Sequence, residues 1–247
     1  MTGTRSDRRN ARAWETAGRQ HGLLARRQLL ALGFTSRAIE HRVQRRRLHP
    51  VARGVYAVGW PQLTARRRWM AAVLACGEGA TLSHRSAAAL LGIGIERPGL
   101  IDVSVRRRCE LRRPGMRIRG RPTLAVADIV LFDDIPVTNA VRTLIDMAAE
   151  LGPIATERAV NDADKRGLID PETLRLALDR YAGEPGVRPL RGLLDRLTFR
   201  LSDSDLEIYF RPIAASAGLP SPIRYQPRKV RTALREANAM LRKRIRH

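Results

Sequence analysis

Residues 33–58 constrain the fold of this chain more than any other stretch. Thr35 is suited to begin a helix, because its hydroxyl accepts a hydrogen bond from a backbone N–H group of the first turn. Apolar residues then recur at helical spacing and form a narrow stripe, which consists of Ala38, Ile39 and Val43. Pro50 stops the helix from continuing, and residues 51–56 surround Gly54 with β-branched and aromatic residues. The stretch therefore predicts a short helix followed by a tight hairpin of two strands.

The predicted helix and hairpin are basic on their outer sides. A short basic helix followed by a basic hairpin suits a DNA groove and the phosphates beside it. The predicted DNA contacts on the helix and just after it are Thr35, Ser36, Arg37, His41, Arg42, Arg45, Arg46 and Arg47. The predicted contacts at the hairpin, the wing, are Arg53 and Tyr56. A solvated helix end is the alternative, because cations near a helix C-terminus are favourable in any protein.

Two more helices are predicted upstream of this stretch. The first covers residues 10–20, with Trp14 and Ala17 facing inward, and ends at the His-Gly pair that follows. The next two leucines lead into the second helix, residues 26–32, which Gly33 stops. Three short helices with tight turns and then a hairpin are the order of elements in a winged helix-turn-helix.

Residues 14–58 resemble the N-terminal domain of AbiEi-type antitoxins, which belong to type IV toxin–antitoxin systems. The matching pieces are the helix ending in Gln20-His21-Gly22, then Leu29-Leu30-Ala31-Leu32-Gly33, the helix from Thr35, and Arg53-Gly54-Val55-Tyr56-Ala57. Residues 81–88 and 135–138 are similar to the actinobacterial members, which carry an α+β region after this domain. The resemblance implies a DNA-binding winged helix that controls its own operon.

The charge of the chain favours a polyanionic partner. Its 247 residues carry a formal net charge of +22 and a pI of about 11.6, while a hydrophobic content of 44% supports a packed core. Acidic residues are frequent between Asp146 and Glu207, so the basic excess lies toward the two ends. A uniform bias toward arginine does not produce that pattern, and double-stranded DNA is the expected partner. An RNA-binding module is a further alternative, but only 4% of the residues are aromatic and such modules need stacking platforms.

Neither a cofactor nor a membrane anchor is expected. Cys76 and Cys109 lie far apart, with no CxxC pair that signals a disulfide framework or a zinc site. No apolar segment follows the basic N-terminus, and the longest apolar run, residues 87–95, is too short to span a bilayer. We therefore expect a cytoplasmic protein with no metal, no cofactor and no catalytic residues.

Residues 63–151 are predicted to form a small α+β unit. Thr64 and Ser83 are suited to cap two helices, and Asn139 a third that runs to residue 151. Alternating or β-branched segments predict strands over residues 100–105, 116–119, 129–132 and 135–138. Ser83 precedes His84, but adjacent residues on a helix point apart, so no catalytic pair is expected.

Two interpretations stay open for residues 106–114, which contain five arginines. The segment either touches the DNA backbone beside the winged helix or is a solvated hairpin loop. Residues 152–200 follow the α+β unit and are predicted to be a helical extension, with helices over residues 153–165, 170–181 and 187–197.

Residues 201–247 resemble the start of a DUF559-type domain, similar to very-short-patch-repair (Vsr-like) endonucleases of the PD-(D/E)xK class. Glu207 matches the helical glutamate of that class. Metal-assisted hydrolysis of a phosphodiester needs several carboxylate oxygens around a divalent ion. Only Glu236 follows Glu207, and residues 230–247 instead predict an amphipathic basic helix. The nuclease core is therefore expected to be missing, and the segment is interpreted as a nonfunctional remnant.

The sequence as a whole predicts an α+β protein in four parts. They are a winged helix-turn-helix over residues 8–60, the α+β unit over 63–151, a helical extension over 152–200 and the truncated remnant with its basic tail over 201–247. The predicted function is sequence-specific DNA binding by a transcriptional regulator of the AbiEi antitoxin type, and not an enzymatic one. The alternative is a DNA endonuclease whose catalytic core is degenerate or lost. The operator, a cognate toxin and the oligomeric state are not predicted.

Overall fold

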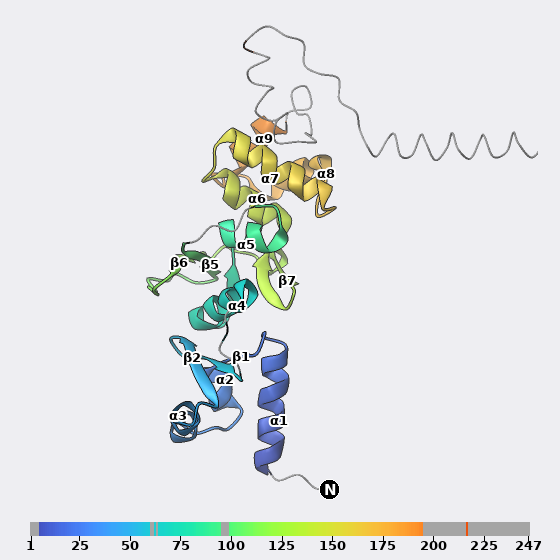
Figure 1. The fold of residues 1–247 in the computed structure, drawn as a ribbon. Coiled ribbons are helices and arrows are strands. Elements are labelled where there is room, and N and C mark those ends of the chain that lie inside the picture. Colours follow the sequence, from blue (N-terminus) through green and yellow to red (C-terminus); the bar gives the residue numbers. More distant parts are fainter. Residues whose placement is uncertain (1–4, 60–61, 63, 95–98, 195–215, 217–247) are drawn as a thin grey trace, which may run out of the picture. The chain divides into compact units, whose positions relative to one another are not determined.

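The computed structural model describes residues 5–59, 62, 64–94, 99–194 and 216, which Figure 1 draws in colour. These residues form a mixed α+β structure with two sheets. The chain divides into two compact units, residues 1–197 and 198–247, and the helices and strands described below belong to the first. The predicted nuclease remnant over residues 201–247 lies outside the described residues, apart from Ser216.

Residues 5–58 contain three helices and an antiparallel sheet of three strands. The elements are α1 (Arg5–Gly18), β1 (Leu23–Ala25), α2 (Arg26–Ala31), α3 (Ser36–Gln44), β2 (Leu48–Ala52) and β3 (Val55–Val58). The strand order is β1-β3-β2, with Leu24 opposite Tyr56 and Leu48 opposite Val58. The two leucines expected to lead into a helix thus belong to a strand, because their backbone pairs with β3, a partner distant in sequence.

One apolar cluster holds the three helices against this sheet. Its buried members are Ala13, Ala17, Leu24, Leu29, Phe34, Ile39 and Leu48. Ala17 faces inward as predicted, but the prediction for Trp14 is wrong, since 63% of its surface is exposed. Ala13 and Ala17 are one helical turn apart and share the buried side of α1, whereas Trp14 lies a further step around the helix.

A five-stranded mixed sheet organises residues 65–148. Its strands are β4 (Ala80–Leu82), β5 (Ile101–Val105), β6 (Met116–Gly120), β7 (Ile129–Phe132) and β8 (Ile135–Thr138), in the order β6-β5-β4-β8-β7. The helices of this region are α4 (Ala65–Cys76), α5 (His84–Leu91), the 3-10 turn η1 (Val126–Asp128) and α6 (Ala140–Ala148). Four strands lie where they were predicted, and the three-residue β4 was missed because it is too short to show a pattern.

The connection between β5 and β6 is not a hairpin. The two strands run parallel, with Ile101 opposite Met116 and Val105 opposite Gly120. Two parallel neighbouring strands need a connection that runs back along them, whereas a hairpin joins antiparallel strands. The interpretation of residues 106–114 as a hairpin loop is therefore wrong. The returning segment passes so close that a Cβ on Gly120 would lie 2.7 Å from the backbone nitrogen of Cys109.

Local cap and turn signals were the most reliable part of the sequence. Thr64 and Asn139 accept hydrogen bonds from backbone nitrogens of the first turns of α4 and α6, as predicted. The β7–β8 turn consists of Asp133 and Asp134, whose φ angles of 52° and 60° match a type I′ hairpin turn. Ser83 stands at the N-cap of α5 but makes no capping hydrogen bond.

The helical extension packs on the α+β region. It consists of α7 (Pro153–Lys165), α8 (Pro171–Ala177), the 3-10 turn η2 (Leu178–Tyr181) and α9 (Val187–Leu193). The hydroxyl of Tyr181 donates to Asp128 Oδ1 at 2.6 Å. Gly186, at the start of α9, approaches α6 so closely that a Cβ would lie 1.8 Å from the Ile145 carbonyl oxygen. Glycine is therefore required at this contact.

Hydrogen bonds also link α4 to the N-terminal helices and strands. Arg67 Nε donates to the His21 carbonyl at 2.8 Å, and Arg27 donates to the Leu74 carbonyl at 2.7 Å. His21 Nε2 in turn lies 2.8 Å from the carbonyl of Asp133 in the β7–β8 turn. These hydrogen bonds join residues 5–58 directly to the α+β region.

Candidate nucleic-acid interface

A capped N-terminus and a buried isoleucine position α3. Thr35 Oγ1 accepts a hydrogen bond from the backbone nitrogen of Ala38 at 3.1 Å, as predicted. The side chain of Ile39 is fully buried in the apolar cluster. Because Ile39 determines which side of the helix faces the core, the polar residues of α3 lie on the outer side.

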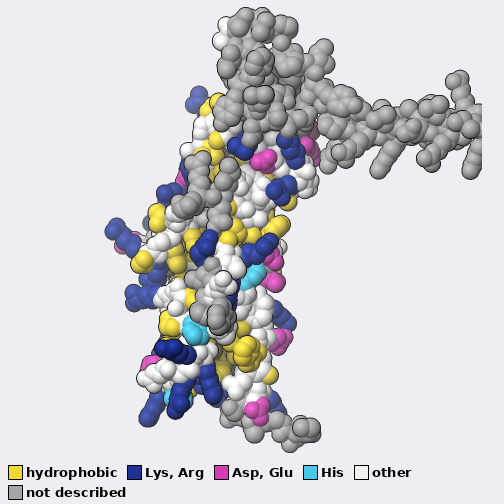
Figure 2. All heavy atoms as spheres, viewed as in Figure 1, with side chains coloured by type: hydrophobic (Ala, Val, Ile, Leu, Met, Phe, Trp, Pro, Cys, Tyr) yellow, Lys and Arg dark blue, Asp and Glu magenta, His cyan; other side chains and the backbone are white. Residues whose placement is uncertain are grey.

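The outer side of α3 and the residues after it are basic and exposed. The predicted contacts that are exposed here are Thr35, Ser36, Arg37, His41, Arg45, Arg46 and Arg47. Figure 2 shows Lys and Arg side chains gathered over this part of the molecule. Among the described residues, no carboxylate pairs with the guanidinium groups of Arg37, Arg45, Arg46 or Arg47. This surface therefore carries positive charge that no described acidic side chain neutralises.

Arg42 differs from the other predicted contacts because it turns toward α1. It donates to the Ala38 carbonyl at 3.1 Å and to Asn10 Oδ1 at 3.4 Å, and its guanidinium lies 4.6 Å from the centre of the Phe34 ring. Arg9 lies over the same ring at 4.4 Å. Burial, and then the charges of Arg9 and Arg47, lower the pKa of Arg42. The cation–π contacts and the half-buried position indicate a side chain that braces α3 against α1.

Three successive arginines form the turn by which the chain leaves α3. The Arg46 nitrogen donates to the Val43 carbonyl at 3.0 Å, and the Arg47 nitrogen donates to the Arg42 carbonyl at 2.8 Å. This is the hydrogen-bond pattern of a Schellman motif, in which the left-handed residue is usually glycine. Here Arg46 takes that position with a φ of 54°, which costs about 1–2 kcal/mol for a residue with a side chain. Strain retained at a basic surface is grounds for a functional hypothesis.

The β2–β3 turn presents Arg53 to solvent, but it does not present Tyr56. Gly54 completes the turn with a φ of 72°, which glycine adopts without strain. Tyr56 is half-buried against the apolar cluster, and its hydroxyl accepts a hydrogen bond from Arg26 at 3.4 Å. Arg26 also lies 3.5 Å from Glu40 of α3. Of the two predicted wing contacts, Arg53 faces outward and Tyr56 connects the sheet to α2.

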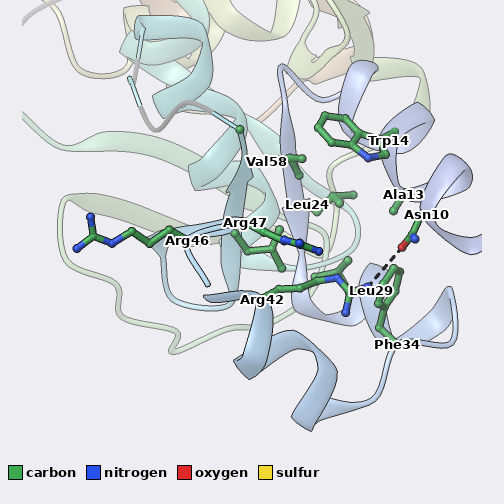
Figure 3. A pocket seen from close by; sticks show the side chains of 12 residues that line it. Asn10, Ala13, Trp14, Leu24, Leu29, Phe34, Arg42, Arg46, Arg47 and Val58 are labelled. Carbon is green, nitrogen blue, oxygen red and sulfur yellow. Dashed lines mark hydrogen bonds between the residues drawn. The ribbon is translucent and has the colours of Figure 1, made fainter. Parts of the chain in front are cut away.

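A pocket of about 370 Å³ opens between α1, the end of α3 and the sheet (Figure 3). Its lining comprises Asn10, Ala13, Trp14, Leu24, Leu29, Phe34, Arg42, Arg46, Arg47, Leu48, Val58 and Gly59. In Figure 3 the side chains of Arg42 and Arg47 extend toward Asn10 and Phe34, whereas Arg46 points away from them. Sequence analysis missed this pocket, because segments far apart in the chain build its walls and no local pattern marks them.

Two arginines of the α+β region, Arg121 and Arg142, are paired in a buried ionic network. Asp146 Oδ1 accepts hydrogen bonds from Arg121 and Arg142, both at 2.8 Å. Arg142 also binds Glu184 at 2.9 Å, and both Arg142 and Asp146 are only 3% exposed. Burial raises the pKa of Asp146 to about 6, although the charge of Arg142 opposes that rise. The i,i+4 spacing of Arg142 and Asp146 is a sequence signal for one pair, but the other partners have no local signal.

The expectation that Ser83 and His84 point apart is wrong. His84 has a φ of 50°, and its Nδ1 lies 3.0 Å from Ser83 Oγ. The rule for adjacent helical residues does not apply, because Ser83 precedes the helix and His84 is left-handed. Asp146 Oδ2 lies 3.6 Å from the same imidazole nitrogen. A Ser-His-acid triad needs the serine and the acid hydrogen-bonded to opposite nitrogens. Ser83 and Asp146 share Nδ1, and Glu150 Oε1 lies 4.0 Å from Nε2, which is too far for a hydrogen bond.

The remaining predictions concern a metal site, the nuclease glutamates and a membrane-spanning helix. Within the described ranges, no group of three or more His, Cys, Asp or Glu side chains is placed to hold a metal ion. Glu207 and Glu236, on which the nuclease alternative depends, lie outside those ranges. Among the helices described here, none has the length and apolar character needed to cross a membrane.

Comparisons with known proteins give no family. No model of a known protein family matches the chain, and none of the curated proteins matches it. The structure is similar to the crystal structure of the Rv2827c protein from Mycobacterium tuberculosis, at 17% sequence identity and a TM-score of 0.44. That similarity covers 77% of this chain and 78% of the other. It is too weak to support a statement about function.

Proposed function

We propose that this chain is a sequence-specific DNA-binding transcriptional regulator, and that residues 5–58 act as a winged helix-turn-helix. The order of elements supports the proposal, since α2 and α3 are joined by a short turn and a hairpin follows α3. One observation carries it: the exposed arginines of α3 and of its exit turn have no carboxylate partner among the described residues. Phosphate oxygens are the partners that such a surface fits.

Two sets of side chains have different roles in this proposal. Ser36, Arg37 and His41 lie on the outer side of α3 and are the candidates for contacts with base edges, because a recognition helix enters the major groove with its N-terminal part. Arginines in the exit turn and the wing are the candidates for phosphate contacts, which orient the protein without reading sequence. We assign Arg42 and Tyr56 to support of α3 rather than to DNA contacts, since Arg42 bonds to Asn10 of α1 and Tyr56 to Arg26 of α2.

The narrower proposal is an AbiEi-type antitoxin that binds its own promoter. It depends on the sequence resemblance of residues 14–58, and cytoplasmic localisation belongs to the same proposal. The endonuclease alternative depends on Glu207 and Glu236, which lie outside the described residues, whereas the exposed arginines that favour DNA binding lie within them.

The test is a DNA titration of the full chain, with fluorescence anisotropy of a duplex from its own promoter and of a scrambled duplex. The variant Arg45→Glu is expected to weaken binding to both duplexes by at least about tenfold, because it replaces a phosphate contact with repulsion. Arg191→Glu is the matched control, since Arg191 is an exposed arginine of α9 that already pairs with Asp179, and the charge change is the same. Binding of the control should equal that of the wild type.

Three results would contradict the proposal. Equal loss in both variants would mean that net charge alone attracts DNA. An absence of salt-dependent binding to any duplex would remove the DNA-binding function. Cleavage of the duplex in the presence of magnesium or manganese would place the endonuclease alternative first.

A further inference from the structure

The floor of the pocket beside α3 is apolar and belongs to the core cluster. Buried residues of that cluster form it, namely Ala13, Leu24, Leu29, Phe34 and Leu48. The exposed Trp14 side chain lies at the α1 side, and Figure 3 shows its ring extending toward Val58. A volume of about 370 Å³ lies within the range of small-molecule sites. The pocket therefore suits an apolar body, aliphatic or aromatic.

One side of the pocket is strongly positive. Arg42, Arg46 and Arg47 belong to its lining, Asn10 adds an amide, and none of the described lining residues is acidic. Arg42 and Arg47 are turned toward the apolar floor rather than away from it (Figure 3). The pKa of Arg42 is lowered, first by burial and then by the charges of Arg9 and Arg47. These cations repel one another across the site, so an anion placed between them would be stabilised.

We propose that this pocket binds a small amphipathic carboxylate, with its apolar body on the core residues and its carboxylate on Arg42 and Arg47. The planar guanidinium groups match a carboxylate in shape and charge. A neutral ligand with the same apolar part would not make this interaction. Two features of the pocket, its apolar floor and its one-sided charge, select this class of ligand.

The ligand competes with DNA for the exit turn of α3, and this second step rests on the proposed function. Arg47 serves both the pocket and the predicted phosphate contacts, and one guanidinium cannot satisfy both partners. Binding of the carboxylate therefore lowers the affinity for DNA, and DNA lowers the affinity for the carboxylate by the same factor.

The first experiment needs no DNA. Decanoate below its critical micelle concentration and decanol below its solubility limit are titrated into the full chain by calorimetry. Decanoate is expected to bind at least about tenfold more tightly than decanol, the gain of a charge-assisted hydrogen bond. Arg47→Gln should remove that preference, and the matched variant Arg53→Gln, an exposed arginine outside the pocket, should keep it. Equal affinities for the two ligands in the wild type would overturn the proposal.

Two further variants locate the ligand. Ala13→Leu fills the pocket and should abolish binding of both ligands, and Trp14→Ala, a change at an exposed residue that leaves the core intact, should weaken both. Undiminished binding by folded protein of either variant would place the ligand elsewhere and overturn the proposal.

The second experiment adds promoter DNA. Decanoate should release DNA from the wild type, and release from Trp14→Ala should need more decanoate. Failure of the wild type to bind DNA would contradict the proposed function while the calorimetric result still stands. Normal DNA binding without any decanoate binding would contradict the ligand site alone.

Discussion

The N-terminal region and the α+β region of this protein use arginine in opposite ways. Arg45 and Arg46 at the end of α3 are exposed and have no carboxylate partner among the described residues. Arg142 of α6 is 3% exposed and lies between Asp146 and Glu184 at 2.8–2.9 Å. A buried guanidinium must be paired, because the loss of hydration is otherwise too costly, whereas a solvated one carries no such requirement.

The difference shows that net charge alone does not locate a binding surface. The chain has a formal net charge of +22, but the arginines of the buried network are neutralised where they stand. Positive charge remains at the exit turn of α3, where Arg45, Arg46 and Arg47 follow one another without a described carboxylate partner. A partner-binding arginine is therefore distinguished from a structural one by its partner and its exposure.

The largest expected effect concerns Arg142. We expect Arg142→Ala to lower the free energy of unfolding by up to about 3–5 kcal/mol, because it removes the more buried of the two cations that Asp146 and Glu184 share and leaves them only Arg121. Arg45→Ala should change it by less than about 0.5 kcal/mol, as for other exposed positions. Urea unfolding of both variants measures the contrast. Similar losses in the two variants would show that the two regions do not differ as proposed.

The second prediction concerns pH and two buried groups of the network. The pKa of Asp146 is raised to about 6, so its contribution to stability is complete below about pH 4 and is lost as pH rises through 6. Burial, and then Arg119, lower the pKa of His84 to about 4, so its contribution is complete above pH 6.5 and is lost as pH falls through 4.

Two asparagine variants separate these opposite slopes. Between pH 4 and 7 the stability of the wild type relative to Asp146→Asn should fall by about 2–3 kcal/mol. Asparagine tolerates the positive φ at position 84, so His84→Asn should keep the backbone unchanged. Relative to this variant, the wild type should gain stability as pH rises over the same range. Chemical unfolding at several pH values measures both differences. Slopes of the same sign would contradict the assignment of the two groups.

The third prediction separates stability from binding at one residue. Arg46→Gly should raise the free energy of unfolding by about 1 kcal/mol, because glycine adopts the left-handed conformation without strain. The same variant should weaken DNA binding, since it removes an exposed cation. Unfolding and anisotropy titrations of one protein sample test both. A variant that is more stable and binds DNA as tightly as the wild type would show that Arg46 has no role in binding.

The smallest expected effect concerns the basic loop after β5. Arg107 and Arg108 are exposed and have no carboxylate partner among the described residues, so the same criterion extends the proposed DNA-binding surface to them. Replacing either by Gln should reduce the slope of log affinity against log salt concentration by up to about 0.9. An unchanged slope would assign this loop to solvent and confine the binding surface to the N-terminal region.

The sequence by itself determined the local elements of this protein. Thr35, Thr64 and Asn139 cap helices as predicted, because a cap depends on residues within one turn. The apolar spacing of α3 likewise placed Ile39 in the core. The winged helix-turn-helix and its DNA contacts remain predictions, and residues 201–247 lie outside the described structure apart from Ser216.

Only the tertiary structure decided which distant residues meet. β1 is a strand because β3 pairs with it, and β5 and β6 are parallel although a short loop joins them. Arg42 turns inward because it contacts Asn10 and Phe34, which belong to other segments of the chain. The walls of the pocket beside α3 likewise come from segments that are far apart in sequence. Such contacts join chain segments that are far apart in sequence. The pattern of one segment can show which of its sides is buried, but it does not show which other segment will cover that side.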